Sequence, residues 1–312
     1  MKIIFMGTPS LAVPALEALR DEHEIVAVVT QPDKLGGRKK ELLASAVKVR
    51  ALELEIPVLQ PERARNEEFV EQLRGHSPQA IAVVAYGQIL PRAILDLPRE
   101  NHPHGGCVNL HFSLLPRWRG AAPVQYAIWH GDTQTGVTTQ WMAEQLDAGD
   151  IILQETIEIA PHETSGELFA RLTPIGAKLL CDTFRLMEKG EAPRVPQDDA
   201  LATFAPTIKK EQGKINWEDN ADLIVNQVRA LNPWPTAWSE FDGALLKVWR
   251  AQIAEQSTQT PPGTIIECRE RVLVAAKNGV VELQEVQAAG RPRMAAADWA
   301  RGARLEIGQK LA

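Results

Sequence analysis

Short, nearly continuous apolar runs alternate with amphipathic stretches through the first half of the chain, and this alternation restricts the fold more than any other feature. Buried strands are predicted at residues 3–6, 25–30, 81–86, 107–111 and 137–142. Helical periodicity is found at residues 44–55, 67–74, 124–130 and 164–189, and Thr164 and Glu167 have the spacing of a capping box. Apolar strands separated by helices form a mostly parallel sheet covered on both faces. We therefore predict an α/β fold with a doubly wound sheet.

The chain changes character near residue 190. Residues 190–213 show neither helical nor strand periodicity, and three prolines lie there among charged and small residues, namely Pro193, Pro196 and Pro206. A helix is then predicted at 221–231, followed by short strands at 245–249, 263–267, 272–276 and 280–286, the last two flanking a tight turn at Lys277-Asn278-Gly279. These elements predict a small OB-like β-barrel. We divide the chain into an α/β domain (1–189), a linker (190–208) and a barrel domain (209–312).

The composition excludes several classes of protein. With 45% hydrophobic residues the chain can bury a sizeable core. No apolar stretch reaches the roughly 18 to 20 residues that a membrane span needs, and the first apolar run is too short for the core of a signal peptide. We therefore predict a cytoplasmic protein. Cys107, Cys181 and Cys268 are odd in number and lack CxxC spacing, which argues against disulfides or zinc and favours buried thiols.

Charge is distributed unevenly along the chain. Residues 1–206 hold 20 Lys and Arg against 27 Asp and Glu, whereas residues 207–312 hold 14 against 13. The less acidic second half is a weak indication of a polyanionic partner.

The turn after the first strand argues against a dinucleotide cofactor. Gly7-Thr8-Pro9 precedes a predicted helix, whose N-terminal N–H groups can bind an anion. The second and third glycines of GxGxxG are missing, and the chain has no GxxxxGK[ST]. An ordinary strand-to-helix turn is the better interpretation.

The strand predicted at 107–111 carries the strongest candidates for catalysis. Asn109 and His111 are two residues apart and point to the same face, near the carboxyl end of the strand, where open α/β sheets bind ligands. An amide donor beside an imidazole can stabilise an oxyanion and move a proton during acyl transfer. The stretch 113–123 is rich in Pro and Gly and forms a loop that can line a pocket.

A second candidate segment is the turn Gln145-Leu146-Asp147-Ala148-Gly149-Asp150. A carboxylate from this turn, placed beside His111, would fix the tautomer of the imidazole. Asp147 is the candidate for this role, and Asp150 is better explained as a turn residue.

Two of these segments, Asn109-Leu110-His111-Phe112-Ser113-Leu114-Leu115-Pro116 and Leu146-Asp147-Ala148-Gly149-Asp150, resemble the active-site motifs of the folate-dependent formyltransferases. The resemblance extends nearly end to end, through Gly7-Thr8-Pro9 and residues 30–33, 84–91, 117–123, 132–137, 213–217, 232–235 and 262–265. The patterns NxHxSLLP and LDxGD are specific to this superfamily. The arginine-containing loop at 117–123 and the second-half motifs indicate the branch that acts on initiator tRNA.

The resemblance implies transfer of a formyl group from 10-formyltetrahydrofolate, a co-substrate, to the free α-amino group of methionine esterified to initiator tRNA, with tetrahydrofolate released. It implies a Rossmann-like catalytic domain and a monomeric protein. It also implies that the protein has no membrane partner and that the reaction requires neither a metal nor a redox cofactor. Asn109 would donate to the oxyanion, His111 would assist the oxyanion and move a proton, and Asp147 would orient His111. Which group takes the amine proton stays open.

Binding residues also carry over from the family. Ser113, Leu114, Leu115 and Pro116 match the segment along which the family places folate. Ile89 and Leu90 resemble part of an apolar loop beside the pterin, with ordinary packing as the alternative.

The tRNA contacts implied by the resemblance centre on the basic loop at residues 33–43, which would enter the acceptor arm. Its Arg38, Lys39 and Lys40 would contact phosphates. The loop reads Gly-Arg-Lys-Lys-Glu where the family usually has Gly-Arg-Gly-Lys-Lys. Arg38 therefore matches the family's arginine, whereas Lys39 and Lys40 match the family's lysines less well. The barrel domain would add a diffuse basic surface, with Lys209, Lys210, Lys214, Arg250, Arg269 and Arg271.

Other functions remain as alternatives at this point. Formyltransferases acting on glycinamide ribonucleotide need only the first domain, whereas those acting on amino sugar nucleotides have a related second domain and fit better. A folate dehydrogenase would need a further domain with a reactive cysteine. A catalytically silent RNA-binding module would tolerate the loss of His111.

Overall fold

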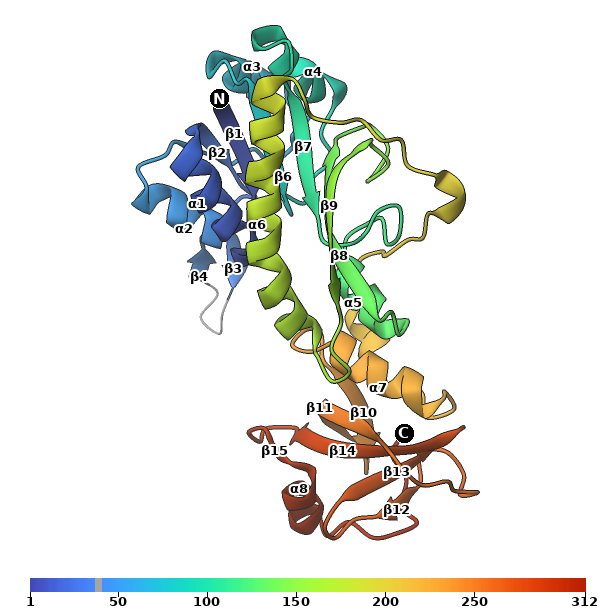
Figure 1. Ribbon diagram of the computed structural model, residues 1–312. Coiled ribbons are helices and arrows are strands. Elements are labelled where there is room, and N and C mark those ends of the chain that lie inside the picture. Colours follow the sequence, from blue (N-terminus) through green and yellow to red (C-terminus); the bar gives the residue numbers. More distant parts are fainter. Residues whose placement is uncertain (37–40) are drawn as a thin grey trace. The chain divides into compact units, whose positions relative to one another are not determined.

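The computed structural model describes residues 1–36 and 41–312 (Figure 1). Two compact units make up the chain. Unit 1 comprises Met1–Gly120, Thr135–Ile157 and Phe169–Ala205, and unit 2 comprises Ala121–Gln134, Glu158–Leu168 and Pro206–Ala312. The segment 190–205, which lies in the predicted linker, groups with unit 1. Within the described residues, no helix combines the length and the apolar character needed to cross a bilayer.

A seven-stranded sheet forms the centre of unit 1. Its order is β5-β2-β1-β6-β7-β8-β9, with the first four neighbouring pairs parallel and β8 antiparallel to β7. The bounds are β1 Lys2–Gly7, β2 Glu24–Val29, β5 Val58–Leu59, β6 Ala80–Val84, β7 Gly106–His111, β8 Gln134–Trp141 and β9 Ile151–Glu158. A separate antiparallel pair is formed by β3 (Lys34–Gly36) and β4 (Glu41–Leu43).

Helices cover both faces of this sheet because its strands are apolar on both sides. Ile4 and Met6 of β1 pack in one cluster with α3 and α4. The opposite face meets α6, where Gly176 lies against Leu110 of β7 and Thr183 shares a hydrogen bond of 2.7 Å with Thr139 of β8. The helix bounds in unit 1 are α1 Val13–Glu22, α2 Ala46–Glu53, α3 Glu67–Gly75, α4 Arg92–Asn101 and α6 Ser165–Lys189, whose first turn groups with unit 2. Helix α5 (Pro123–Trp129) belongs to unit 2.

The predicted capping box at the start of α6 is confirmed. Glu167 accepts from the backbone N–H of Thr164 at 2.8 Å, and the Thr164 hydroxyl accepts from the backbone N–H of Glu167 at 3.3 Å. The three cysteines are free. Cys107 and Cys181 are buried as predicted, whereas Cys268, also predicted to be buried, is partly exposed.

Unit 2 is built on an antiparallel sheet of order β10-β11-β14-β13-β12, with β15 beside β14. The predicted hairpin is confirmed, because Ala276 pairs with Gly279 across Lys277-Asn278. The bounds are α7 Ala221–Ala230, β10 Ala237–Phe241, β11 Ala244–Ala254, β12 Ile265–Glu267, β13 Val272–Ala276, β14 Gly279–Ala288, β15 Met294–Ala295 and α8 Ala296–Ala303. The predicted fold class, a doubly wound sheet followed by a smaller antiparallel β domain, is confirmed.

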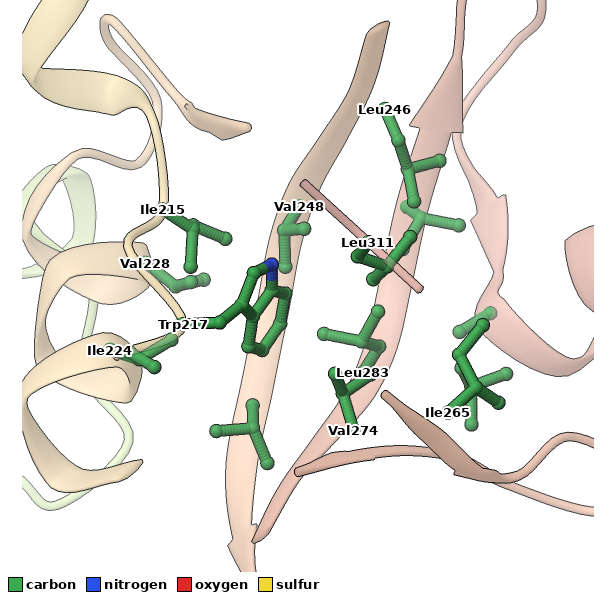
Figure 2. Packing of buried hydrophobic residues seen from close by; sticks show 14 of the residues in the cluster. Ile215, Trp217, Ile224, Val228, Leu246, Val248, Ile265, Val274, Leu283 and Leu311 are labelled. Carbon is green, nitrogen blue, oxygen red and sulfur yellow. The ribbon is translucent and has the colours of Figure 1, made fainter. Parts of the chain in front are cut away.

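Residues 308–312 close this sheet into a barrel. The Leu311 N–H donates to the Gly263 carbonyl and Ile265 donates to Gln309, both beside β12, at 2.9 and 2.8 Å. On the other side, Ala312 and Glu240 of β10 exchange two backbone hydrogen bonds of 2.9 Å. Figure 2 shows Leu311 among the core side chains, and the same cluster contains Trp217 and α7.

We expect Leu311→Ala to lower the free energy of unfolding of unit 2 by about 2–4 kcal/mol, because Leu311 is 3% exposed and its loss leaves a cavity at the closing seam. Urea unfolding followed by tryptophan fluorescence measures this change. Ile307→Ala is the matched control, since Ile307 is 68% exposed and should change stability by less than about 0.5 kcal/mol. Equal effects of both variants would contradict closure by this segment.

Candidate active site

Asn109 and His111 reach one side of the sheet because β7 alternates. Leu110 packs on α6, so its two neighbours point to the opposite face. The antiparallel pairing of β7 with β8 places Gln140 directly opposite Asn109 and Thr138 opposite His111. The side chain of His111 is 6% exposed, so the imidazole is enclosed by protein.

The structure brings Asp147 beside His111, as predicted, and also beside Asn109, which was not predicted. Asp147 Oδ1 accepts from Asn109 Nδ2 at 3.3 Å and from Gln140 Nε2 at 2.9 Å. Its Oδ2 accepts from the backbone N–H of Gly120 at 2.9 Å and lies 3.7 Å from His111 Nδ1. Three hydrogen-bond donors and the imidazole thus surround the two carboxylate oxygens and determine their orientation.

The backbone around Asp147 needs particular residue types. Asp147 has φ of 51°, a left-handed conformation that Asp tolerates better than most residues. A Cβ on Gly149 would lie 1.7 Å from the carbonyl oxygen of Trp141, so only glycine fits there. The LDxGD pattern therefore has a steric basis.

The hydrogen bonds of His111 define its tautomer. Nε2 lies 2.8 Å from the carbonyl oxygen of Trp118. A carbonyl only accepts, so Nε2 carries a proton and donates. In the neutral ring Nδ1 is then the basic nitrogen, and it faces Asp147. The Trp118 carbonyl, rather than the carboxylate expected from the sequence, therefore sets the tautomer. A proton added at Nδ1 would create an imidazolium beside a carboxylate, which stabilises it.

Gln140 and Gly120 are contributors that the sequence analysis did not single out. Gln140 could have been found from the strand pairing, because it lies opposite Asn109. Gly120 has φ of 122°, and a Cβ there would lie 2.6 Å from the Ala205 carbonyl oxygen. The close contact between Gly120 and Ala205 joins residues far apart in the sequence, so no local pattern indicates it.

The predicted folate residues have different exposures. Ser113, Leu115 and Leu90 are buried, and the Ser113 hydroxyl donates to the Arg117 carbonyl at 2.6 Å. Leu114 and Pro116 are partly buried, whereas Ile89 is 77% exposed. Their contact with folate stays a prediction.

A cavity of about 270 Å³ lies beside the segment that leads to Asp147. It is lined by apolar and charged groups together, namely Arg92, Leu95, Asp96, Arg99, Gly106, Cys107, Trp141, Met142, Ala143 and Glu144. Among the described residues, no three His, Cys, Asp or Glu side chains are grouped as metal ligands.

The predicted tRNA residues Arg38, Lys39 and Lys40 lie outside the described residues. The segments on either side of them pair as β3 and β4, with Lys34 opposite Leu43.

We expect Gly120→Ala to lower the free energy of unfolding of unit 1 by about 1–3 kcal/mol, because the new Cβ combines an unfavourable φ with a clash against Ala205. Thermal unfolding measures the loss. Gly75→Ala is the control, since no atom lies within 4 Å of the added Cβ. Equal stability of the two variants would contradict the tight approach at Gly120.

Comparison with known proteins gives consistent matches over both halves of the chain. Residues 1–184 match the formyl transferase family, and residues 207–304 match the formyl transferase C-terminal domain. A protein of Moorella thermoacetica named methionyl-tRNA formyltransferase is 48% identical over 313 residues, covering 100% of this chain and 99% of that protein.

Two solved structures share the fold. A methionyl-tRNA formyltransferase from Clostridium thermocellum has a TM-score of 0.56 at 19% identity, covering 90% of this chain and 99% of that one. HypX from Aquifex aeolicus in complex with tetrahydrofolic acid has a TM-score of 0.63 at 18% identity, covering 99% of this chain and 48% of that one. Because the family match spans more than half of its residues and a relative is similar over its full length, the chain belongs to the formyl transferase family that includes the methionyl-tRNA formyltransferases.

Proposed function

We propose that this protein transfers the formyl group of 10-formyltetrahydrofolate to the free α-amino group of methionine on initiator tRNA, giving N-formylmethionyl-tRNA and tetrahydrofolate. The observation that carries the proposal is the Asp147 carboxylate, which contacts Asn109 and faces the basic nitrogen of His111. Family membership and the 48% identity to a methionyl-tRNA formyltransferase support the choice of acceptor.

The proposed reaction forms a bond between the amine nitrogen and the formyl carbon, and it breaks the bond from that carbon to N10 of the folate. Negative charge develops on the formyl oxygen as the amine attacks. Asn109 has a second amide hydrogen beyond the one directed at Asp147, and this hydrogen would donate to the oxyanion.

The amine must lose a proton and N10 must gain one. His111 Nδ1 is the basic nitrogen of the ring, and Asp147 stabilises the imidazolium that forms when it accepts a proton. We infer that His111 and Asp147 act as a pair that removes the amine proton and returns it to N10. The Trp118 carbonyl holds the ring in position throughout.

The cavity beside residues 141–144 has apolar walls and a charged rim, where Arg92 pairs with Asp96 and Glu144. Such a mixed lining suits a flat heterocycle with polar edges. We propose that the pterin binds there. The exposed Ile89 and the segment 113–116 would then guide the remainder of the folate.

For the tRNA, we propose contacts from Arg38, Lys39 and Lys40 and from the basic side chains of the barrel domain. We propose a catalytic domain at 1–189, a linker at 190–208 and a tRNA-binding domain at 209–312. The protein would work as a monomer in the cytoplasm, where translation supplies its acceptor.

The deciding experiment measures formyl transfer from 10-formyltetrahydrofolate to purified Met-charged initiator tRNA, with an amino sugar nucleotide as a parallel acceptor. We expect formylation of the tRNA alone. Transfer to the sugar alone would overturn the acceptor while leaving the catalytic residues in place.

We expect Asp147→Asn and His111→Ala to lower kcat by about 10²–10⁴-fold while the Kd for tRNA changes little, because both groups act on proton movement. In Asp147→Asn the new amide must place an N–H group against existing donors. Single-turnover kinetics and a filter-binding assay check the two quantities. Wild-type kcat in either variant would contradict the assigned role.

Arg38→Ala should raise the KM for Met-tRNA by about tenfold, since loss of one phosphate contact weakens binding by an amount of this order at moderate salt. Arg63→Ala, an exposed arginine elsewhere in unit 1, makes the same charge change and should have little effect. Steady-state kinetics at two salt concentrations separates them. Identical KM values for the two variants would remove Arg38 from the tRNA interface.

A further inference from the structure

The segment 190–205 runs against the loops that form the active site. Val195 and Ile151 exchange two backbone hydrogen bonds of 2.8 and 3.1 Å. Farther along, the Arg119 N–H donates to the Thr203 carbonyl at 2.8 Å, and Ala205 donates back to Arg119 at 2.8 Å. All of these residues belong to unit 1. The segment is therefore part of the framework around Asp147.

Gln197 is the residue of this segment that reaches the Asp147 turn. Its Nε2 donates to the Asp147 carbonyl at 2.8 Å and to the Gly149 carbonyl at 2.7 Å. A weaker third contact, of 3.3 Å, runs to Gln140 Oε1. One side chain thus holds the turn on both sides of Ala148.

The other end of the Gln197 amide is held as firmly. Its Oε1 accepts from Arg119 Nε and Nη2 at 3.0 and 2.9 Å. Arg119 is 2% exposed, and its Nη2 also donates to Asp199 at 2.7 Å. A guanidinium only donates and a carbonyl only accepts, so the orientation of the Gln197 amide is determined by its partners.

This orientation extends to the carboxylate through Gln140. With its Oε1 facing Gln197, Gln140 directs Nε2 to Asp147 Oδ1 at 2.9 Å. Gln197 therefore acts on Asp147 twice, through the main chain of the turn and through the amide of Gln140.

We propose that Gln197 is a positioning residue for Asp147, holding the carboxylate against Asn109 and His111 with Arg119 as its buried anchor. The proposal rests on the proposed function for the role of Asp147 in catalysis. Loss of such support displaces a reacting group, and a displacement near 1 Å can lower the rate by about 100-fold.

Two variants distinguish the hydrogen bonds that Gln197 donates to the Asp147 turn from those that it accepts from Arg119. Gln197→Met keeps the length and removes every hydrogen bond, whereas Gln197→Glu keeps the acceptor for Arg119 and replaces the donor to the turn. Asp198→Ala is the matched control in the same segment, because Asp198 is exposed and accepts from Ala200 N–H, outside the Asp147 turn.

The first measurement needs no substrate. Hydrogen exchange of the Gly120 amide, followed by NMR in the full chain, reports on the carboxylate because this N–H donates to Asp147 Oδ2. We expect exchange at least tenfold faster in both Gln197 variants and unchanged in Asp198→Ala. Wild-type protection of Gly120 in the folded Gln197 variants would overturn the proposal.

The second measurement is kinetic. We expect kcat to fall by about 10- to 100-fold in both Gln197 variants with KM for each substrate nearly unchanged. In an Asp147→Asn background the same substitutions should have little further effect, because Gln197 acts through Asp147. If the Gln197 substitutions lowered kcat in the Asp147→Asn background as much as in the wild type, the proposal would be overturned. It would also be overturned if these substitutions changed only KM or only thermal stability. If the wild-type protein failed to formylate Met-tRNA, the proposed function would fail while the exchange experiment still decided the positioning.

Discussion

The geometry of the site depends on the hydrogen bonds that the Asp147 carboxylate accepts. The carboxylate accepts from Asn109 of β7, from Gln140 of β8 and from the Gly120 backbone, and it faces His111. Each donor comes from a different segment, so the carboxylate also ties these segments together. Because Asp147 is partly buried, its oxygens take most of their hydrogen bonds from protein groups, and the same set of bonds gives the site its geometry.

The doubly wound sheet explains why these groups meet. β7 needs apolar side chains on the face covered by α6, which leaves Asn109 and His111 on the other face. Antiparallel pairing with β8 brings Gln140 into line with Asn109 and delivers the chain directly into the Asp147 turn. The family's sequence motifs are thus the residues that the sheet places at one location, together with the glycines that let the backbone approach closely.

Much of the fold was predictable because its signals are local. The apolar strands of unit 1, the capping box of α6 and the hairpin after β13 follow from periodicity and turn chemistry within short windows. Strand β9 was not predicted because its sequence, Ile-Ile-Leu-Gln-Glu-Thr-Ile-Glu, is apolar at one end and mainly polar at the other, without the alternation in hydrophobicity that is typical of a strand. Helix α4 was not predicted because Pro98 interrupts the helical pattern. In unit 2, β10 and α8 were not predicted, because β10 is defined by its pairing with β11 and with Ala312, and α8 by the packing of Trp299 and Ala300 in the core.

The sequence by itself determined the fold class and the three catalytic candidates, since strand spacing and motif resemblance are properties of neighbouring residues. The tertiary structure decided the contacts between distant segments. The partners of Asp147 at Gln140 and Gly120, the tautomer of His111 set by Trp118, and closure of the barrel by residues 308–312 all join residues that no local pattern relates. The physical reason is that hydrogen-bond geometry and close packing depend on the backbone path, which emerges only when the whole core forms.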